Sequence, residues 1–209
     1  MNGDFEADVQ SSNSFSYMTP SGWQWAGSSP AMAWSFGSLV VSSGASYWGD
    51  GNAPSGTNYL ALQGNGAAIS QNIVLAPGST ITFYTRNRPW ANGTPVTLVV
   101  TYGTTLLSQI YLPASISPSL TAWTLQSVVV PAGLPSGSAA QAFGISLSAD
   151  QYSYPFNSCA EIDDIVISRP GGTVFTWLLR LHLCRFVLRL FTCHLFFKST
   201  ISVELDVLN

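Results

Sequence analysis

"NYLALQGNGAAISQNIVLAPGSTITFYTR", residues 58–86, carries the strongest fold signal in the sequence. Apolar and polar side chains alternate in three short runs, as they do in half-buried β-strands, because successive side chains of a strand point to opposite faces. The runs cover residues 58–63, 67–74 and 79–86. "GNG" (64–66) and "APG" (76–78) separate them and predict turns, the first within a hairpin.

The same pattern continues to residue 168. Further runs cover residues 95–102, 105–112, 122–131, 142–149 and 161–168. Short strands separated by Gly, Pro and Asn turns predict an all-β fold, a β-sandwich, over residues 1–170. No run in that range has the period of a helix. Residues 9–57 are less regular, and we expect 46–58 to form a long loop.

Residues 171–209 differ in composition from the body. They are rich in Leu and Phe but include Arg180, Arg185 and Arg189, and each Arg at the centre of a membrane-spanning helix costs about 2.5–3.5 kcal/mol. The arginines do not share one helical face, so a membrane-surface helix also fits poorly. We expect an apolar, basic tail outside the fold. Three interpretations stay open for the tail: a disordered segment, a helix, or read-through past a native end. We favour read-through, and we disfavour membrane association of the tail.

Charge and catalytic groups narrow the function classes. Only 8% of the residues are charged and the net charge is −3, which argues against non-specific nucleic-acid binding. Both histidines, His182 and His194, lie in the tail, so the body cannot form a Ser–His–Asp or Cys–His arrangement. A glycosidase needs two carboxylates facing a cleft, and the acidic residues cluster only at 4–8 and 161–164. We therefore expect that the domain is not an enzyme.

The first acidic cluster lies in "NGDFEADV" (2–9), which we interpret as the first strand. Strand alternation would place Asp4, Glu6 and Asp8 on one side, with Phe5 and Val9 on the other.

The second acidic cluster lies in "EIDDIVIS" (161–168), where alternation would place Asp163 with Ile165 and Ile167, opposite Asp164. One carboxylate therefore faces apolar residues and needs a partner. A calcium ion would supply that partner, since Ca²⁺ binds carboxylates and backbone carbonyls. The alternative is that both acidic clusters are solvated strand faces.

"NGDFE", "YLALQGNGAAISQNI", "PGSTITFYTR" and "IDDIVIS" together resemble galactose-binding-like jelly-roll domains, which include the family 4/9/22-type carbohydrate-binding modules and related cell-surface domains. The resemblance implies a two-sheet antiparallel jelly-roll sandwich and a structural Ca²⁺ near the first and last strands. It makes Glu6 and one of Asp163 and Asp164 the candidate side-chain ligands. Phe5 would point inward, and Asp4 and Asp8 would stay in solvent.

A sugar site is the other implication of the resemblance. Trp90 is our first candidate for stacking on a sugar ring and Trp48 the second, because the apolar face of a sugar stacks on indole. The alternative for the tryptophans of residues 9–57 is that they cap the ends of the core. The remaining candidates for ligand contacts are Tyr84, Arg86, Asn87, Arg88 and Gln71.

The expected function is a non-catalytic module that binds a polysaccharide or other glycan outside the cell or at its surface. Two alternatives stay open: a structural adhesion or protein-interaction sandwich without a small ligand, and an ancillary fragment of a larger secreted hydrolase. No basic segment followed by an apolar stretch opens the sequence, so it shows no signal peptide, and we expect either a cytoplasmic protein or a fragment of an exported chain.

Overall fold

The computed structural model describes residues 3–8, 10–27, 37–48, 52–88, 94–114, 122–134, 139–149 and 158–170. The chain divides into two compact units, Met1–Gly171 and Gly172–Asn209, and all described residues belong to the first. The three readings of the 171–209 tail therefore fall outside the described residues. Within the described ranges, no helix has the length and apolar character needed to cross a membrane.

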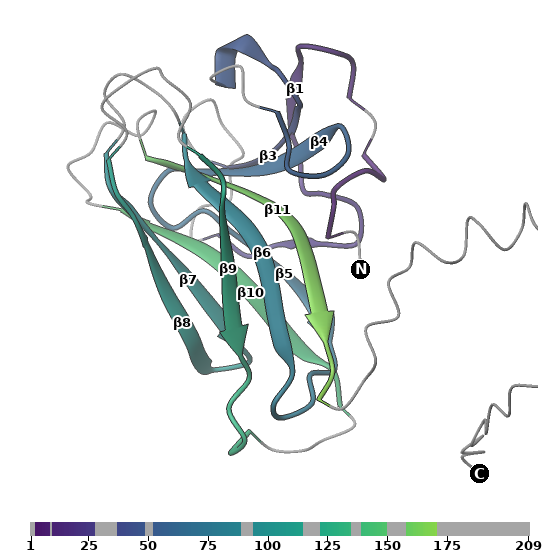
Figure 1. Ribbon diagram of the computed structural model, residues 1–209, viewed down its shortest axis with the longest axis vertical. Helices are drawn as coiled ribbons and strands as arrows, with labels where there is room; N and C mark the ends of the chain where they lie inside the picture. The colour runs from purple at the N-terminus through teal and green to yellow at the C-terminus, as the bar shows by residue number, and fades with distance from the viewer. Residues whose placement is uncertain are drawn as a thin grey trace, which may run out of the picture. The chain divides into compact units, whose positions relative to one another are not determined.

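Two antiparallel sheets build the domain, as predicted (Figure 1). The six-stranded sheet has the order β1 (Phe15–Tyr17), β3 (Gly37–Ser42), β4 (Asn58–Gln63), β11 (Cys159–Ser168), β6 (Thr80–Asn87) and β9 (Thr124–Val129). The five-stranded sheet has the order β2 (Gln24–Trp25), β5 (Ala68–Ile73), β10 (Gln141–Ala149), β7 (Val96–Tyr102) and β8 (Thr105–Leu112). All neighbouring strands pair antiparallel.

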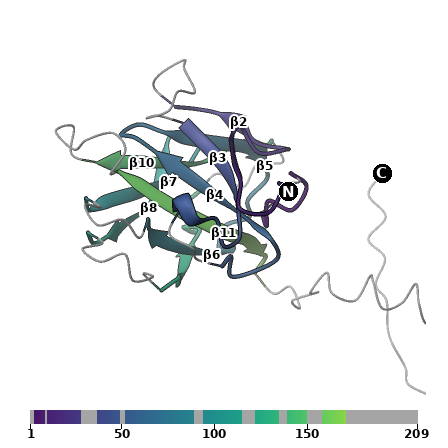
Figure 2. The ribbon, with the colours of Figure 1, turned by 90° about the horizontal axis from the view of Figure 1, so that it is seen from above.

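The main core fills the space between the two sheets, which lie over each other when seen from above (Figure 2). Leu60, Phe83 and Ile162 project into it from the six-stranded sheet, and Leu98 and Ile145 from the five-stranded sheet. These side chains are fully buried, and they occupy the alternate strand positions that the sequence marks as apolar.

A second apolar cluster lies on the other face of the six-stranded sheet. It contains Leu39 and Val41 of β3, Tyr59 and Ala61 of β4, and Cys159 of β11. Trp48, in a short 3₁₀ turn (η1, Ser46–Trp48), is also buried in this cluster. Because β3 is buried on both faces, it lacks the apolar–polar alternation of a half-buried strand, and the sequence gives only a weak signal for it.

Three sequence predictions of local structure are wrong. Residues 3–8 form turns rather than a first strand, with Phe5 at a φ of 55°. The link at 64–66 is not a hairpin, because β4 and β5 belong to different sheets. Asp163 does not share a face with Ile165 and Ile167, because a bulge between Asp163 and Val166 shifts the alternation of β11.

Candidate functional site

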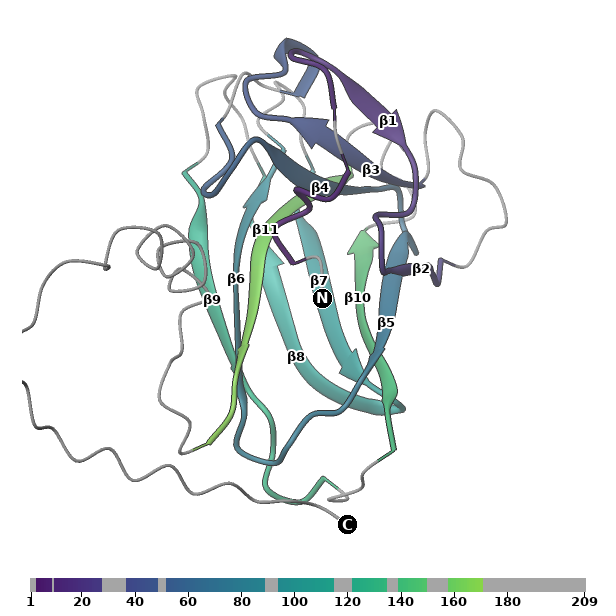
Figure 3. The same cartoon turned by 90° about the vertical axis from the view of Figure 1, so that its right-hand side faces the viewer.

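The N-terminal turn packs against the bulge of β11, and Figure 3 shows the purple N-terminal segment beside β4 and β11. The amide of Ile165 donates to the carbonyl of Gly3 at 2.8 Å, and a Cβ atom on Gly3 would lie 2.2 Å from the carbonyl oxygen of Ile165. Phe5 is fully buried against Trp23, with ring centroids 6.3 Å apart, so the expected inward direction of Phe5 is confirmed.

The carboxylate of Glu6 closes the turn that leads into β4. Its Oε1 accepts from the amides of Thr57 and Asn58, both at 2.7 Å, and its Oε2 accepts from the Thr57 hydroxyl at 2.7 Å. A Cβ atom on Gly56, whose φ is 63°, would lie 2.5 Å from the carboxyl carbon of Glu6. Only glycine leaves room for the Glu6 carboxylate beside this turn.

Asp4 and Asp8 have different surroundings. Asp4 is exposed, as expected. Asp8 is buried, contrary to expectation, because Ser21 donates to its carboxylate through both the amide (2.9 Å) and the hydroxyl (2.6 Å). Asp8 therefore fixes the turn before Trp23 rather than facing solvent.

Asp163 is the most deeply buried of the predicted metal ligands. Its Oδ1 accepts from the amide of Asp164 at 2.8 Å and its Oδ2 from the amide of Ser55 at 3.2 Å. Burial raises the pKa of Asp163 to about 8, and the nearby charges of Asp164 and Glu6 add to that rise. No cation among the described residues pairs with Asp163.

Asp164 and Asn58 flank this carboxylate region. Asp164 is half-buried at a φ of 52°, and burial, with the charge of Asp4, raises its pKa. Asn58 donates to the carbonyl of Asp8 at 2.9 Å, while its buried Oδ1 has no partner in the described part of the chain. These ranges contain no group of three or more His, Cys, Asp or Glu that could hold a metal. A metal here would need carbonyl and amide oxygens beside the carboxylates.

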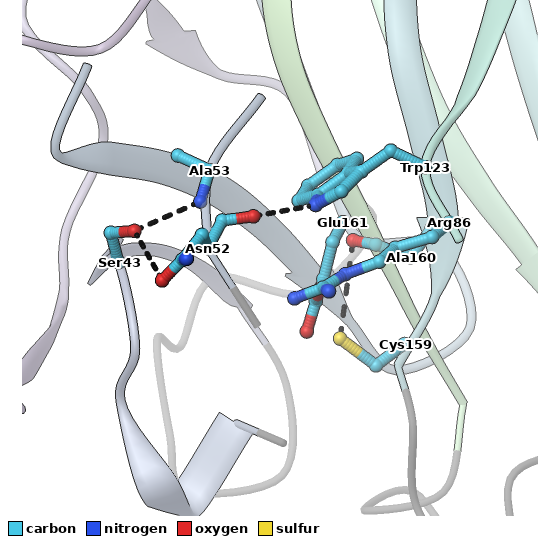
Figure 4. A network of polar contacts seen from close by, with 8 residues as sticks. All are labelled: Ser43, Asn52, Ala53, Arg86, Trp123, Cys159, Ala160 and Glu161. Atoms are coloured by element: carbon cyan, nitrogen blue, oxygen red, sulfur yellow. Dashed lines mark hydrogen bonds and ion pairs between the residues drawn. The ribbon is translucent and has the colours of Figure 1, made fainter. Parts of the chain in front are cut away.

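A separate polar group lies on the outer face of the six-stranded sheet, within the second apolar cluster. Arg86 of β6 and Glu161 of β11 stand opposite each other in register, and the Nε of Arg86 donates to Oε2 of Glu161 in a buried ion pair (Figure 4). Tyr59 of the next strand, β4, lies beside this pair. We call Arg86, Glu161, Tyr59 and Trp123 the Arg86–Glu161 cluster.

Aromatic rings enclose the guanidinium of Arg86. Its Cζ lies 4.4 Å from the ring centroid of Trp123 and 5.5 Å from that of Tyr59, and these two rings meet edge to face at 5.6 Å. Trp123 is half-buried, and its indole N–H donates to the carbonyl of Asn52 at 2.8 Å (Figure 4). The cluster therefore lies directly beneath a side chain that is partly open to solvent.

Burial controls the protonation of the cluster. It raises the pKa of Glu161 to about 7, although the charge of Arg86 and the hydrogen bond from Arg86 lower it. Burial also raises the pKa of Tyr59 and that of the neighbouring Cys159 thiol, so both stay protonated at neutral pH. Arg86 is close enough to lower the pKa of Tyr59, although the Tyr59 hydroxyl makes no hydrogen bond of normal geometry within the described ranges.

Three buried polar atoms of the cluster lack partners. They are the hydroxyl oxygen of Tyr59, Nη2 of Arg86 and Oε1 of Glu161, counted over the residues that the structure describes. Most buried polar side-chain atoms in proteins do have a partner, so three orphaned atoms in one group require an explanation. Together these atoms offer a donor on Arg86, a hydroxyl on Tyr59 that can donate or accept, and an acceptor on Glu161.

The structure brings some of the predicted ligand residues together. The guanidinium of Arg88 lies 4.1 Å from the ring centroid of Trp48, on the same face as Arg86. Trp48 is only 2% exposed, so it caps the second apolar cluster, and no sugar could stack on it as it stands. Tyr84 is half-buried opposite Asp163, on the same face.

Other predicted ligand residues lie apart. Asn87 points to the opposite side of β6 and donates to the carbonyls of Thr94 and Pro113, at 2.8 and 2.9 Å. Gln71 belongs to the five-stranded sheet and donates to the carbonyl of Gly22 at 2.7 Å. Trp90, the first stacking candidate, lies outside the described residues.

Sequence reasoning missed Glu161, Tyr59 and Trp123 as site residues. One signal was available for Glu161: Arg86 lies within a predicted strand that is otherwise uncharged, so a buried Arg86 requires a carboxylate on a neighbouring strand. No comparable signal marked Tyr59 or Trp123.

No protein-family model matches the sequence, and no curated protein matches it significantly. Several solved structures share its fold. A cyclase from Fischerella sp. TAU is 19% identical with a TM-score of 0.57, covering 82% of this chain and 96% of that one. The K2 cleaved adhesin domain of Lys-gingipain is 16% identical with a TM-score of 0.52, covering 79% and 96%. TmCBM61, solved with β-1,4-galactotriose, is 16% identical and covers 80% and 95%, but its TM-score of 0.47 is too low to support an argument.

These likenesses show the fold alone, and at that level they agree with the expected two-sheet antiparallel jelly-roll sandwich. They also correct one expectation. Four of the similar structures are cyclases from Fischerella. The prediction that the domain is not an enzyme is therefore wrong as a deduction from its sequence and fold, because the same fold serves catalytic proteins as well as adhesin domains.

Proposed function

We propose that this domain recognises a glycan outside the cell and binds a sugar at the Arg86–Glu161 cluster. The observation that carries the proposal is the set of three orphaned buried polar atoms beside the half-exposed Trp123. Sugar sites combine apolar ring faces with a few convergent polar groups, and this cluster offers both. The half-exposed Trp123 supplies the aromatic face, and the polar atoms of Arg86, Glu161 and Tyr59 supply hydrogen bonds.

A glycan array followed by calorimetric titration with the best oligosaccharide tests this proposal. Trp123→Ala should weaken binding by about tenfold or more, because it removes the aromatic ring over Arg86. Tyr111→Ala is the matched control, since Tyr111 is an exposed aromatic residue on β8 of the other sheet. Its affinity should equal that of the wild type. No binding to any glycan, or binding that survives Trp123→Ala, would refute the assignment and favour a structural or protein-interaction role.

We further propose that a calcium ion is held between the N-terminal turn and the bulge of β11. The support is the buried carboxylate of Asp163 without a described cation, the nearby carboxylate of Glu6, and the orphaned Oδ1 of Asn58. Asp164 is a further candidate ligand. Ca²⁺ takes about six to eight oxygen ligands, so backbone carbonyls would complete the shell. Bound calcium would neutralise the carboxylates and hold the turn against β11.

The melting temperature of the domain in calcium and in chelator tests the calcium proposal. Calcium should raise it by about 2–4 °C or more, because an ion that binds only the native state stabilises that state. Asp163→Asn should remove the shift. An unchanged melting temperature in millimolar calcium would rule the ion out.

A further inference from the structure

The three orphaned atoms of the Arg86–Glu161 cluster specify what a ligand must offer. Nη2 of Arg86 can only donate, and the hydroxyl of Tyr59 can donate. Oε1 of Glu161 can accept. The three side chains are each 0–3% exposed, so water does not freely replace a missing partner, and a ligand reaches them only when the half-buried Trp123 over Arg86 turns aside.

Charge further limits the ligand. A carboxylate or sulfate could accept from Arg86 but would meet the unpartnered Oε1 of Glu161, and an ionised Glu161 repels a like charge strongly in a buried site. A cation could satisfy Glu161 but would meet the guanidinium of Arg86. An ion of either sign therefore satisfies one side of the pair and opposes the other.

A pair of hydroxyl groups meets both requirements, because each hydroxyl can donate and accept. We infer that the cluster binds a neutral sugar through two neighbouring hydroxyls, one accepting from Nη2 of Arg86 and the other donating to Oε1 of Glu161. The Tyr59 hydroxyl donates to the first of these oxygens, and the ring of Trp123 provides an apolar wall. This inference rests on the proposed glycan-binding function and names the class of sugar.

Tyr59→Phe is the most direct variant. It removes one orphaned hydroxyl and leaves the packing of the ring in place. It should weaken binding of a neutral oligosaccharide by about fivefold while leaving the melting temperature of the free domain unchanged or raised, because a buried unsatisfied hydroxyl destabilises the free state. A residue with a purely structural role would show no loss of affinity.

Glu161→Gln tests the charge argument, since the variant keeps the shape of the side chain. Titrations with a neutral oligosaccharide and with one that carries uronic acids, in wild type and variant, should show two changes. Wild type should prefer the neutral sugar by about tenfold or more, and Glu161→Gln should reduce that preference. Circular dichroism and thermal unfolding show whether the variant is folded, and Tyr59→Phe provides the second variant if it is not.

The outcomes separate this inference from the proposed function. If no sugar binds, or if binding ignores Trp123→Ala, the glycan proposal itself fails. If binding depends on Trp123 but the uronate sugar is preferred, or if Tyr59→Phe leaves the affinity intact, the glycan proposal stands and the inference of a neutral diol is overturned.

Discussion

Glu161 and Arg86 face each other across β11 and β6 as a buried ion pair that satisfies only part of the hydrogen-bonding capacity of each side chain. Burying two charges in this way costs a large desolvation free energy, which their attraction offsets only when the remaining polar atoms have partners. The pair therefore lowers the stability of the free domain relative to an apolar pair, and a ligand that completes it would recover that free energy.

The first prediction concerns the pair itself. Arg86→Met or Glu161→Leu alone should lower the free energy of unfolding by about 3–5 kcal/mol, because each leaves one buried charge without its partner. The double variant should recover most of that loss. Urea unfolding of the four proteins measures the coupling. If the two single effects simply add in the double variant, the pair does not act as a unit.

A second prediction concerns pH. Burial raises the pKa of Glu161 from 4.5 to about 7 and that of Asp163 from 3.8 to about 8. At a pH between the pKa of each group in the unfolded chain and its higher pKa in the folded domain, the folded domain holds more protons than the unfolded chain. The free energy of unfolding therefore falls as pH rises through this range. In chelator, the melting temperature should therefore be higher at pH 5 than at pH 8.

Calcium and Asp163→Asn provide the controls for this pH dependence. Bound calcium should reduce the fall, since it stabilises the ionised carboxylate of Asp163. Asp163→Asn should reduce the fall in chelator, because it removes one of the two titrating groups. A melting temperature that rises from pH 5 to pH 8 in chelator would contradict the raised pKa values.

Gly56→Ala is the third prediction. The φ of 63° at Gly56 disfavours alanine by about 1–2 kcal/mol. In addition, the new Cβ would displace the carboxylate of Glu6, which lies 2.5 Å away. The variant should melt lower than wild type and show a smaller response to calcium. Gly133→Ala is the matched control, since a Cβ there meets no atom within 4 Å. Equal effects of the two substitutions on melting would disprove the role of Gly56.

The fourth prediction concerns the tail. All described strands end by Ser168, so a chain of residues 1–170 should fold by itself and unfold in one cooperative transition. A chain that ends at residue 158 should not fold, because it loses β11, which lies between β4 and β6 in the six-stranded sheet. Calorimetry of the two chains measures this. If the chain of residues 1–170 shows no cooperative transition, the tail is part of the fold.

Much of the sandwich is predictable from sequence, because half-buried strands impose a period of two on their side chains. β4 and β8 coincide with the predicted runs, β7 begins one residue later than predicted, and β6 is shifted by one residue at both ends. Short edge strands such as β1 and β2 carry too few residues for a period to be visible.

The site is less predictable, for two physical reasons. First, a single bulged residue, Asp164, reverses the faces assigned to the rest of β11, and no local sequence rule reveals it. Second, the cluster depends on register: Glu161 meets Arg86, and Trp123 covers them, only because β11 lies next to β6 and β6 next to β9. Strand order follows from the whole chain, so pairs of residues far apart in sequence stay hidden.

The central claim is that a neutral sugar binds at Arg86 and Glu161. A crystal structure of residues 1–170 with a bound neutral oligosaccharide tests it most directly. We expect one sugar hydroxyl within hydrogen-bond distance of Nη2 of Arg86, a neighbouring hydroxyl within that distance of Oε1 of Glu161, and the sugar ring beside Trp123. A sugar bound elsewhere, such as on the five-stranded sheet near Tyr111, with both atoms still unpartnered, would contradict it.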